Sequence, residues 1–73
     1  MSTQVVLLGS TGSIGTQALE VIDQHREEFE VVALSAGGRS LELLAEQCVR
    51  YRPRVVGIHD GDARRLESLI ASA

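Results

Sequence analysis

The feature that most constrains this 73-residue chain is a short apolar run followed at once by three glycines at intervals of three. Residues 5–8 are Val-Val-Leu-Leu, and Gly9, Gly12 and Gly15 follow before a helical pattern begins. A continuous apolar run that ends at a glycine is typical of a parallel strand buried on both faces. The sequence therefore predicts a strand, a glycine-rich turn and a helix that opens near Ser13.

The rest of the chain predicts two more strands and two more helices. The runs "FEVVALSAGG" and "RVVGIHD" have strand character, and Pro53 ends the helical stretch that begins at Ser40. Helical spacing predicts three apolar faces, formed by Ile14, Ala18, Val21 and Ile22, by Leu41, Leu44, Ala45 and Cys48, and by Leu66, Leu69, Ile70 and Ala73. Strands that alternate with helices in this way favour an α/β fold with right-handed crossovers and a parallel sheet.

This β-α-β-α-β-α order is that of a Rossmann-like dinucleotide-binding fold, as a three-stranded portion of a longer doubly wound sheet. The common strand order 3-2-1-4-5-6 places the first strand at the centre of the sheet, whereas here it would be an edge. An apolar edge strand is usually covered in a folded protein. We therefore expect residues 1–73 to form an incomplete portion of one such domain.

The three glycines have distinct roles in such a fold. The first permits a tight turn, the second lets the backbone approach a pyrophosphate, and the third lets helix and strand pack closely. The unpaired N–H groups at the start of the helix favour an anion, and nearby hydroxyls add donors. The candidate cofactor-binding residues of the turn are Gly9, Ser10, Thr11, Gly12, Ser13, Ile14 and Gly15. Because the spacing is G-x-x-G-x-x-G and not G-x-G-x-x-G, glycines that serve packing alone are the alternative.

The end of the second strand distinguishes two cofactors. An NAD site usually has an Asp or Glu there, whereas this chain has "SAGGRS" and no carboxylate until Glu42. Gly37 and Gly38 allow a close approach, Arg39 can pair with a 2′-phosphate, and Ser40 can donate from the helix start. NADPH is therefore expected in preference to NADH. The alternative is that Arg39 is solvated and Ser40 only caps the helix.

Composition argues against several other functions. The net charge of −3 with scattered arginines provides no basic surface for nucleic acid, and the absence of lysine excludes a G-x-x-x-x-G-K-[ST] phosphate loop. A single cysteine cannot form an internal disulfide, which favours a reducing compartment. The first apolar run is too short for a signal peptide or a membrane span, so a cytoplasmic protein without a membrane partner is expected.

The remaining candidate residues have structural interpretations. Asp60 and Asp62 flank a glycine in a pattern that predicts a helix cap and not a metal site. His59 lies near the C-terminal end of the third predicted strand, where a lone histidine is more often a surface or core residue than a ligand. His25 is expected at a helix end and Cys48 on an apolar face.

The stretch "LLGSTGSIGTQALEVI", followed by "FEVVALSAGG" and "RPRVVGI", resembles the N-terminal part of the bacterial 1-deoxy-D-xylulose 5-phosphate reductoisomerase family over essentially the whole chain. The resemblance implies an NADPH-dependent enzyme of the non-mevalonate route to isoprenoids, which converts 1-deoxy-D-xylulose 5-phosphate to 2-C-methyl-D-erythritol 4-phosphate with magnesium, manganese or cobalt. It also implies that Thr11, Gly12, Ser13 and Ile14 hold the pyrophosphate, and that Gly37, Gly38, Arg39 and Ser40 surround the ribose phosphate.

The resemblance places the metal-binding carboxylates, the substrate-phosphate residues and the flexible lid further along a longer polypeptide. It implies a homodimer, no catalytic or metal-binding residue before Ala73, and no activity of this segment alone. Many family members have a basic residue and an asparagine directly after the first glycine of the second strand, so the register of Gly38, Arg39 and Ser40 is left open. Two other functions stay open as well, a free-standing NADP(H)-sensing module and another NADP-dependent reductase or epimerase.

Overall fold

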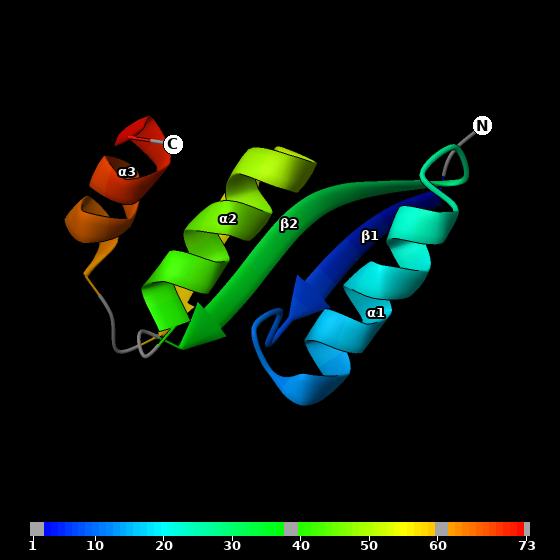
Figure 1. The fold of residues 1–73 in the computed structure, drawn as a ribbon, viewed down its shortest axis with the longest axis horizontal. Helices are drawn as coiled ribbons and strands as arrows, with labels where there is room; N and C mark the ends of the chain where they lie inside the picture. Colours follow the sequence, from blue (N-terminus) through cyan, green and yellow to red (C-terminus); the bar gives the residue numbers. More distant parts are fainter. Residues whose placement is uncertain (1–2, 38–39, 60–61, 73) are drawn as a thin grey trace.

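The computed structural model describes residues 3–37, 40–59 and 62–72, which form parallel strands alternating with helices (Figure 1). In chain order the elements are β1 (Thr3–Leu8), α1 (Ser13–Gln24), β2 (Phe29–Gly37), α2 (Leu41–Tyr51), β3 (Val55–His59) and α3 (Ala63–Ser72). This order confirms the predicted Rossmann-like α/β fold class.

The sheet has the strand order β1-β2-β3, so both crossovers step in the same direction. Right-handed crossovers that step in one direction bring their helices to the same face of a sheet. Figure 1 shows α1 and α2 in front of the strands, with α3 beside α2. Among the described residues, the second face of the sheet therefore carries no helix, and β1 is an edge strand.

β1 is not buried on both faces, and that prediction was wrong. Val5 and Leu7 pack against the core, whereas Val6 is 62% and Leu8 80% exposed. Alternate residues of a strand point to opposite faces of the sheet, and only the face toward the helices is covered here. Val6 and Leu8 are therefore exposed although they are apolar.

β2 contains a bulge at Val32. Val5 pairs with Val31, but the next residue, Val6, pairs with Ala33, so Val32 is the extra residue on β2. The carbonyl of Val32 accepts the backbone N–H of Arg54 at 2.7 Å, directly before β3 begins. A bulge changes which residues of a strand share a face.

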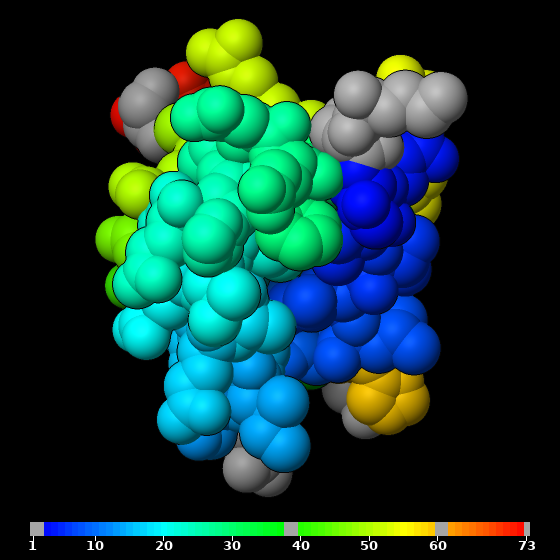
Figure 2. All heavy atoms as spheres, turned by 90° about the vertical axis from the view of Figure 1, so that its right-hand side faces the viewer, coloured from blue at the N-terminus to red at the C-terminus, as the bar shows by residue number. Residues whose placement is uncertain are grey.

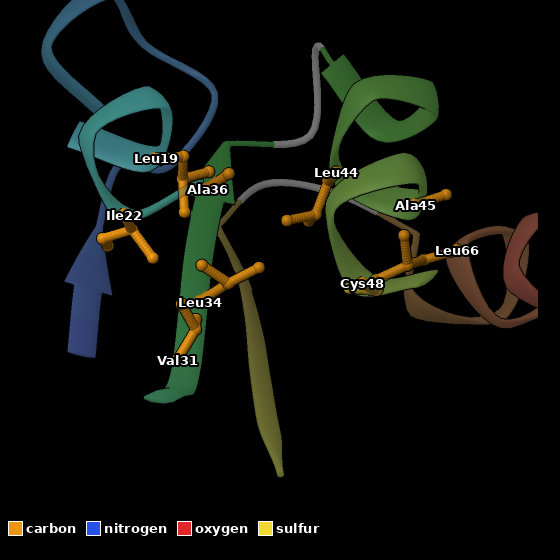
Figure 3. Close-up of a cluster of buried hydrophobic side chains, with 9 residues drawn as sticks. All are labelled: Leu19, Ile22, Val31, Leu34, Ala36, Leu44, Ala45, Cys48 and Leu66. Atoms are coloured by element: carbon orange, nitrogen blue, oxygen red, sulfur yellow. The ribbon is translucent and has the colours of Figure 1, made fainter. Parts of the chain in front are cut away.

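The core lies between β2 and the helices (Figure 3). In that view Leu19 of α1 and Leu44 of α2 point toward β2, and Cys48 of α2 lies beside Leu66 of α3. The buried apolar residues are Leu19, Ile22, Val31, Leu34, Ala36, Leu44, Ala45, Cys48 and Leu66. β2 is thus the strand against which both crossover helices pack.

The buried face of α1 differs from the prediction. Gly15, Leu19 and Ile22 are buried, whereas Ile14 is 82% and Val21 55% exposed. Residues spaced by four and then three form one stripe on a helix, and Ile14 and Val21 each lie one position off that stripe. Of the predicted face, Ile22 is buried as expected.

The predicted faces of α2 and α3 are confirmed. Leu44, Ala45 and Cys48 are buried, and Leu41 is partly buried against the same cluster. On α3, Leu66 is buried and its apolar neighbours one turn later, Leu69 and Ile70, are partly buried. Ala73 lies outside the described residues.

Candidate functional site

The candidate site is the turn of residues 9–12, which joins the end of β1 to the start of α1. Gly9 has a φ of 78°, in the left-handed region that glycine adopts without strain. A Cβ on Gly15 would overlap the carbonyl oxygen of Gly9 and lie 2.8 Å from Cα of Ser10, so α1 begins in direct backbone contact with the turn. The tight turn and the close packing predicted for the first and third glycines are both present.

Gly12 differs from the other two glycines. Its φ of −76° is open to any residue, and a Cβ there would meet only the carbonyl oxygen of Gly9, at an ordinary distance of 3.5 Å. Gly12 is also exposed. The described residues thus provide no steric reason for glycine at this position, which is what we expect where a ligand lies against the backbone.

The first half of the turn is held by β2 and α2. The carbonyl of Ser35 on β2 accepts the N–H of Gly9 at 2.8 Å and that of Ser10 at 2.9 Å. From α2, Nε2 of Gln47 donates to the carbonyl of Ser10 at 2.9 Å. Ser10 and Gln47 are buried, at 0% and 6% exposure. The turn is therefore fixed on its inner side, and its outer side faces solvent.

The start of α1 offers hydrogen-bond donors. The first N–H groups of a helix have no partner within the helix. No side chain of the described residues caps α1, and its first turn contains no acidic residue. The hydroxyl of Thr16 donates to the carbonyl of Ser13 at 3.0 Å and so is used within the helix. These N–H groups and the positive end of the helix dipole would stabilise an anion beside Gly12.

A groove of about 560 Å³ lies along this part of the molecule. Figure 2 shows the corresponding side, with β1 (blue) open to solvent beside α1 (cyan). The groove is lined by Val6, Leu7, Leu8, Gly9, Gly12, Ser13, Ile14, Gly15 and Ala18. Exposed Leu8 and Ile14 therefore flank the glycines, and the groove combines backbone donors with apolar walls.

The second part of the predicted site is at the end of β2. Leu8 pairs with Ser35, so β2 ends beside the glycine turn. Gly37 closes β2 and is exposed, and Ser40 is the N-cap residue of α2 without a side-chain capping hydrogen bond. The hydroxyl of Ser40 is thus not used as a cap. Gly38 and Arg39, also predicted to bind, lie outside the described residues.

The predicted contact residues of the turn differ in exposure. Ser13 and Ile14 are exposed and line the groove, and Thr11 is half-buried. The hydroxyl of Ser10 is buried and has no hydrogen-bond partner among the described residues, so its side chain lies under the turn. The contacts of these residues with a cofactor stay predictions.

Gln47 is absent from the residues predicted from the sequence. Leu44, Gln47, Cys48 and Tyr51 are spaced as one face of α2, so a polar residue interrupts an otherwise apolar stripe. That interruption is the signal that could have identified Gln47. Its partner Ser10 is 37 residues away in the sequence, and no local pattern indicates such a contact.

A charged cluster ties α1 to α2 at the far end of α1 from the turn. Arg50 donates to both carboxylate oxygens of Asp23, at 2.7 Å to Oδ2, and Arg26 donates to Oδ1 at 3.3 Å. These hydrogen bonds, that from Arg50 above all, hold the pKa of Asp23 below its ordinary value. Tyr51 donates to the carbonyl of Leu19 at 3.3 Å, and burial raises its pKa. The cluster fastens two helices and lies apart from the groove.

The structural interpretations of Asp62 and Cys48 agree with the structure. Oδ1 of Asp62 accepts the N–H groups of Arg64 and Arg65 at the start of α3, which is a helix cap. Cys48 is a free buried cysteine, and burial raises the pKa of its thiol. Within residues 3–37, 40–59 and 62–72, no three His, Cys, Asp or Glu side chains are grouped so as to hold a metal ion. No helix in those ranges is long and apolar enough to span a membrane.

The chain is similar to known proteins over nearly its whole length. A protein-family model described as 1-deoxy-D-xylulose 5-phosphate reductoisomerase matches residues 5–73. A curated protein of that name from Arthrobacter sp. (strain FB24) is 59% identical over 70 residues, which cover 96% of this chain and 18% of that protein. Its counterpart from Paenarthrobacter aurescens (strain TC1) is 57% identical with the same coverage. One from Synechocystis sp. (strain ATCC 27184 / PCC 6803 / Kazusa) is 46% identical over 72 residues, or 99% of this chain and 18% of that protein. The chain spans about a fifth of the length of these relatives.

Proposed function

Because this chain belongs to the 1-deoxy-D-xylulose 5-phosphate reductoisomerase family, we propose that it is the NADPH-binding part of an enzyme converting 1-deoxy-D-xylulose 5-phosphate to 2-C-methyl-D-erythritol 4-phosphate. The enzyme would be an oxidoreductase of non-mevalonate isoprenoid biosynthesis. The observation that carries the proposal is the environment of Gly12. It is exposed, and packing among the described residues does not require a glycine there. It is also the N-cap residue of α1, at which no side chain of the described residues makes a capping hydrogen bond. Family membership favours this function over a sensing module or another reductase.

The described residues fit a dinucleotide by their chemistry. The N–H groups at the start of α1 and the open backbone at Gly12 would bind the pyrophosphate, with Ser13 as a further donor. The fixed inner side of the turn would orient the dinucleotide along the carboxyl ends of the strands, where such folds bind their ligands. NADPH, when bound, supplies the hydride. This chain thus supplies binding and orientation.

We assign the 2′-phosphate to the end of β2 and the start of α2. The proposed contacts there are Gly37, Gly38, Arg39 and Ser40. The hydroxyl of Ser40, which makes no capping hydrogen bond to α2, supports this assignment, and so does the absence of a carboxylate from the described end of β2. An NAD-type site would place an Asp or Glu at that point to bind the ribose hydroxyl.

The rest of the proposed function follows from the family. Residues 1–73 would form an incomplete NADPH-binding domain of a cytoplasmic homodimer with a sugar-phosphate substrate. The divalent metal would be magnesium, manganese or cobalt, and the family resemblance is what supports ligands that lie outside this segment. The catalytic residues are likewise proposed to lie elsewhere.

Calorimetric titration of the chain with NADPH and NADH tests this proposal. NADPH should bind more tightly than NADH, and Gly12→Val should abolish both signals while the chain stays folded, because a Cβ there meets the Gly9 carbonyl oxygen at an ordinary distance of 3.5 Å. Arg39→Ala should weaken the binding of NADPH but not that of NADH. Arg64→Ala, at an exposed position of α3, is the matched control. A folded chain that binds neither cofactor would contradict the function, and equal affinity for both would contradict the assignment of the 2′-phosphate.

A further inference from the structure

We propose that Gln47 is a positioning residue for the cofactor, because its side-chain amide holds the turn that receives the pyrophosphate. This role rests on the proposed NADPH function. Gln47 would not touch the cofactor itself. It acts through the backbone of Ser10, from a different helix and from beneath the turn.

The contact has a defined orientation. Nε2 of Gln47 lies 2.9 Å from the carbonyl oxygen of Ser10, and only the amide nitrogen can donate to that oxygen. Both residues are nearly closed to solvent, at 6% and 0% exposure, so water does not readily replace the bond. A buried carbonyl that loses its donor is destabilised by the full cost of its desolvation.

Gln47 completes the restraint of Ser10. The N–H of Ser10 is bound by the carbonyl of Ser35 on β2, and the carbonyl of Ser10 is bound by Gln47 on α2. The two peptide groups that flank Ser10 are therefore fixed by two different elements. The residues that follow, from Thr11 to the start of α1, carry the proposed pyrophosphate donors.

A fixed turn binds its ligand at a smaller entropic cost than a mobile one. Gly9 and Gly12 give the turn wide conformational freedom, which must be restricted before the N–H groups can converge on an anion. The hydrogen bond from Gln47 restricts the segment between these two glycines in advance. Its loss should weaken the binding of any dinucleotide, because the pyrophosphate is common to NADPH and NADH.

Gln47 also connects the two parts of the proposed site. It lies seven residues after Ser40 on α2, or about 10 Å along the helix axis. Ser40 belongs to the part assigned to the 2′-phosphate, and Ser10 to the part assigned to the pyrophosphate. Helix α2 thus begins at the residues assigned to the 2′-phosphate and anchors the turn assigned to the pyrophosphate.

The test compares two variants with the same chemical change. Gln47→Met keeps the approximate volume but removes the donor, and Gln24→Met makes the same change at an exposed position of α1. Dissociation constants for NADPH and NADH are measured at a temperature at which circular dichroism shows every variant to be folded. Gln47→Met should raise both constants about tenfold at an unchanged ratio, and Gln24→Met should change them less than about twofold.

Amide hydrogen exchange supplies a readout that does not depend on the cofactor. In the unliganded chain, Gln47→Met should accelerate exchange in residues 9–13 about tenfold more than exchange at Leu34 in the core, which reports the change in global stability alone, and Gln24→Met should show no such difference. Wild-type NADPH affinity together with unchanged turn exchange in Gln47→Met would overturn the proposal. Tenfold weaker binding that is equal in the two variants would overturn it as well.

Nuclear magnetic resonance of the wild-type chain covers the case in which Gln47→Met does not fold. The side-chain amide protons of Gln47 should exchange far more slowly than those of Gln24 and shift when NADPH is added. Equal exchange of the two side chains would overturn the proposal. Failure of the folded wild-type chain to bind NADPH would contradict the proposed function alone, and the side-chain amide exchange of Gln47 would still decide whether Gln47 holds the turn.

Discussion

Substitution of Gly15 by alanine separates the glycine that the fold needs from the one assigned to a ligand. A Cβ on Gly15 would overlap the carbonyl oxygen of Gly9 and lie 2.8 and 2.9 Å from two backbone atoms of Ser10. A Cβ on Gly12 would meet one atom at 3.5 Å. We therefore predict that Gly15→Ala destabilises the fold clearly more than Gly12→Ala does.

The expected magnitude follows from the atoms involved. Overpacking costs about 1–3 kcal/mol, and here the upper part of that range applies because the obstacle is backbone held by Ser35 and Gln47. Alanine inside a helix recovers about 1 kcal/mol relative to glycine. The net loss is about 2 kcal/mol, against a total of roughly 4–11 kcal/mol for a chain of this length. Gly12→Ala should cost no more than about 1 kcal/mol, because the added Cβ meets no close atom and only the poorer N-cap preference of alanine counts against it.

Urea unfolding followed by circular dichroism measures both changes, and thermal unfolding should show a midpoint roughly 8–16 °C lower for Gly15→Ala. The cofactor titration should rank the two variants the other way, since Gly12→Ala should weaken NADPH binding more although it lowers the stability of the fold less. The reasoning would be refuted if Gly15→Ala were as stable as the wild type, or if both substitutions destabilised the fold equally.

Three further predictions concern the fold. Leu44→Ala should lower the free energy of unfolding by about 2–5 kcal/mol in a urea titration, because Leu44 is fully buried, and a loss below about 1 kcal/mol would contradict that packing. Asp62→Ala should lower it by about 1 kcal/mol through loss of the α3 cap, and Glu67→Ala on exposed α3 should not. The pKa of Asp23 is lowered in the folded state, so its ion pair stabilises the fold above about pH 3.8 and that contribution is lost as the pH falls through the lowered pKa. Asp23→Asn should therefore cost less than about 1 kcal/mol at neutral pH, and its stability should fall less between pH 7 and pH 3 than that of the wild type.

The glycine turn could be predicted from the sequence because its causes are local. The positive φ of Gly9 and the closeness of Gly15 to the turn are requirements of the backbone itself. The fold class followed from the alternation of apolar strands with helical spacing. These features depend on residues that are neighbours in the sequence.

Burial was harder to predict because it depends on what lies opposite each residue. Ile14 and Val21 have helical apolar spacing with Ile22, yet they are exposed, and the buried residue of that stretch is Leu19. Leu8 is as apolar as Leu7 but points to the sheet face without a helix. Apolar character favours burial, but whether a given residue is buried depends on whether a helix covers its face of the sheet.

The bulge at Val32 has a consequence for how substitutions in β2 would be tolerated. Val31 and Leu34 both face the helices although three positions separate them, because Val32 adds one residue between two otherwise regular halves. In a saturation scan, sensitivity to polar substitution should therefore alternate along β2 up to Val31, slip by one position, and alternate again from Leu34. The bulge would then appear in a profile of variant fitness as a one-position shift in the alternation of sensitive and tolerant residues, even without a structure.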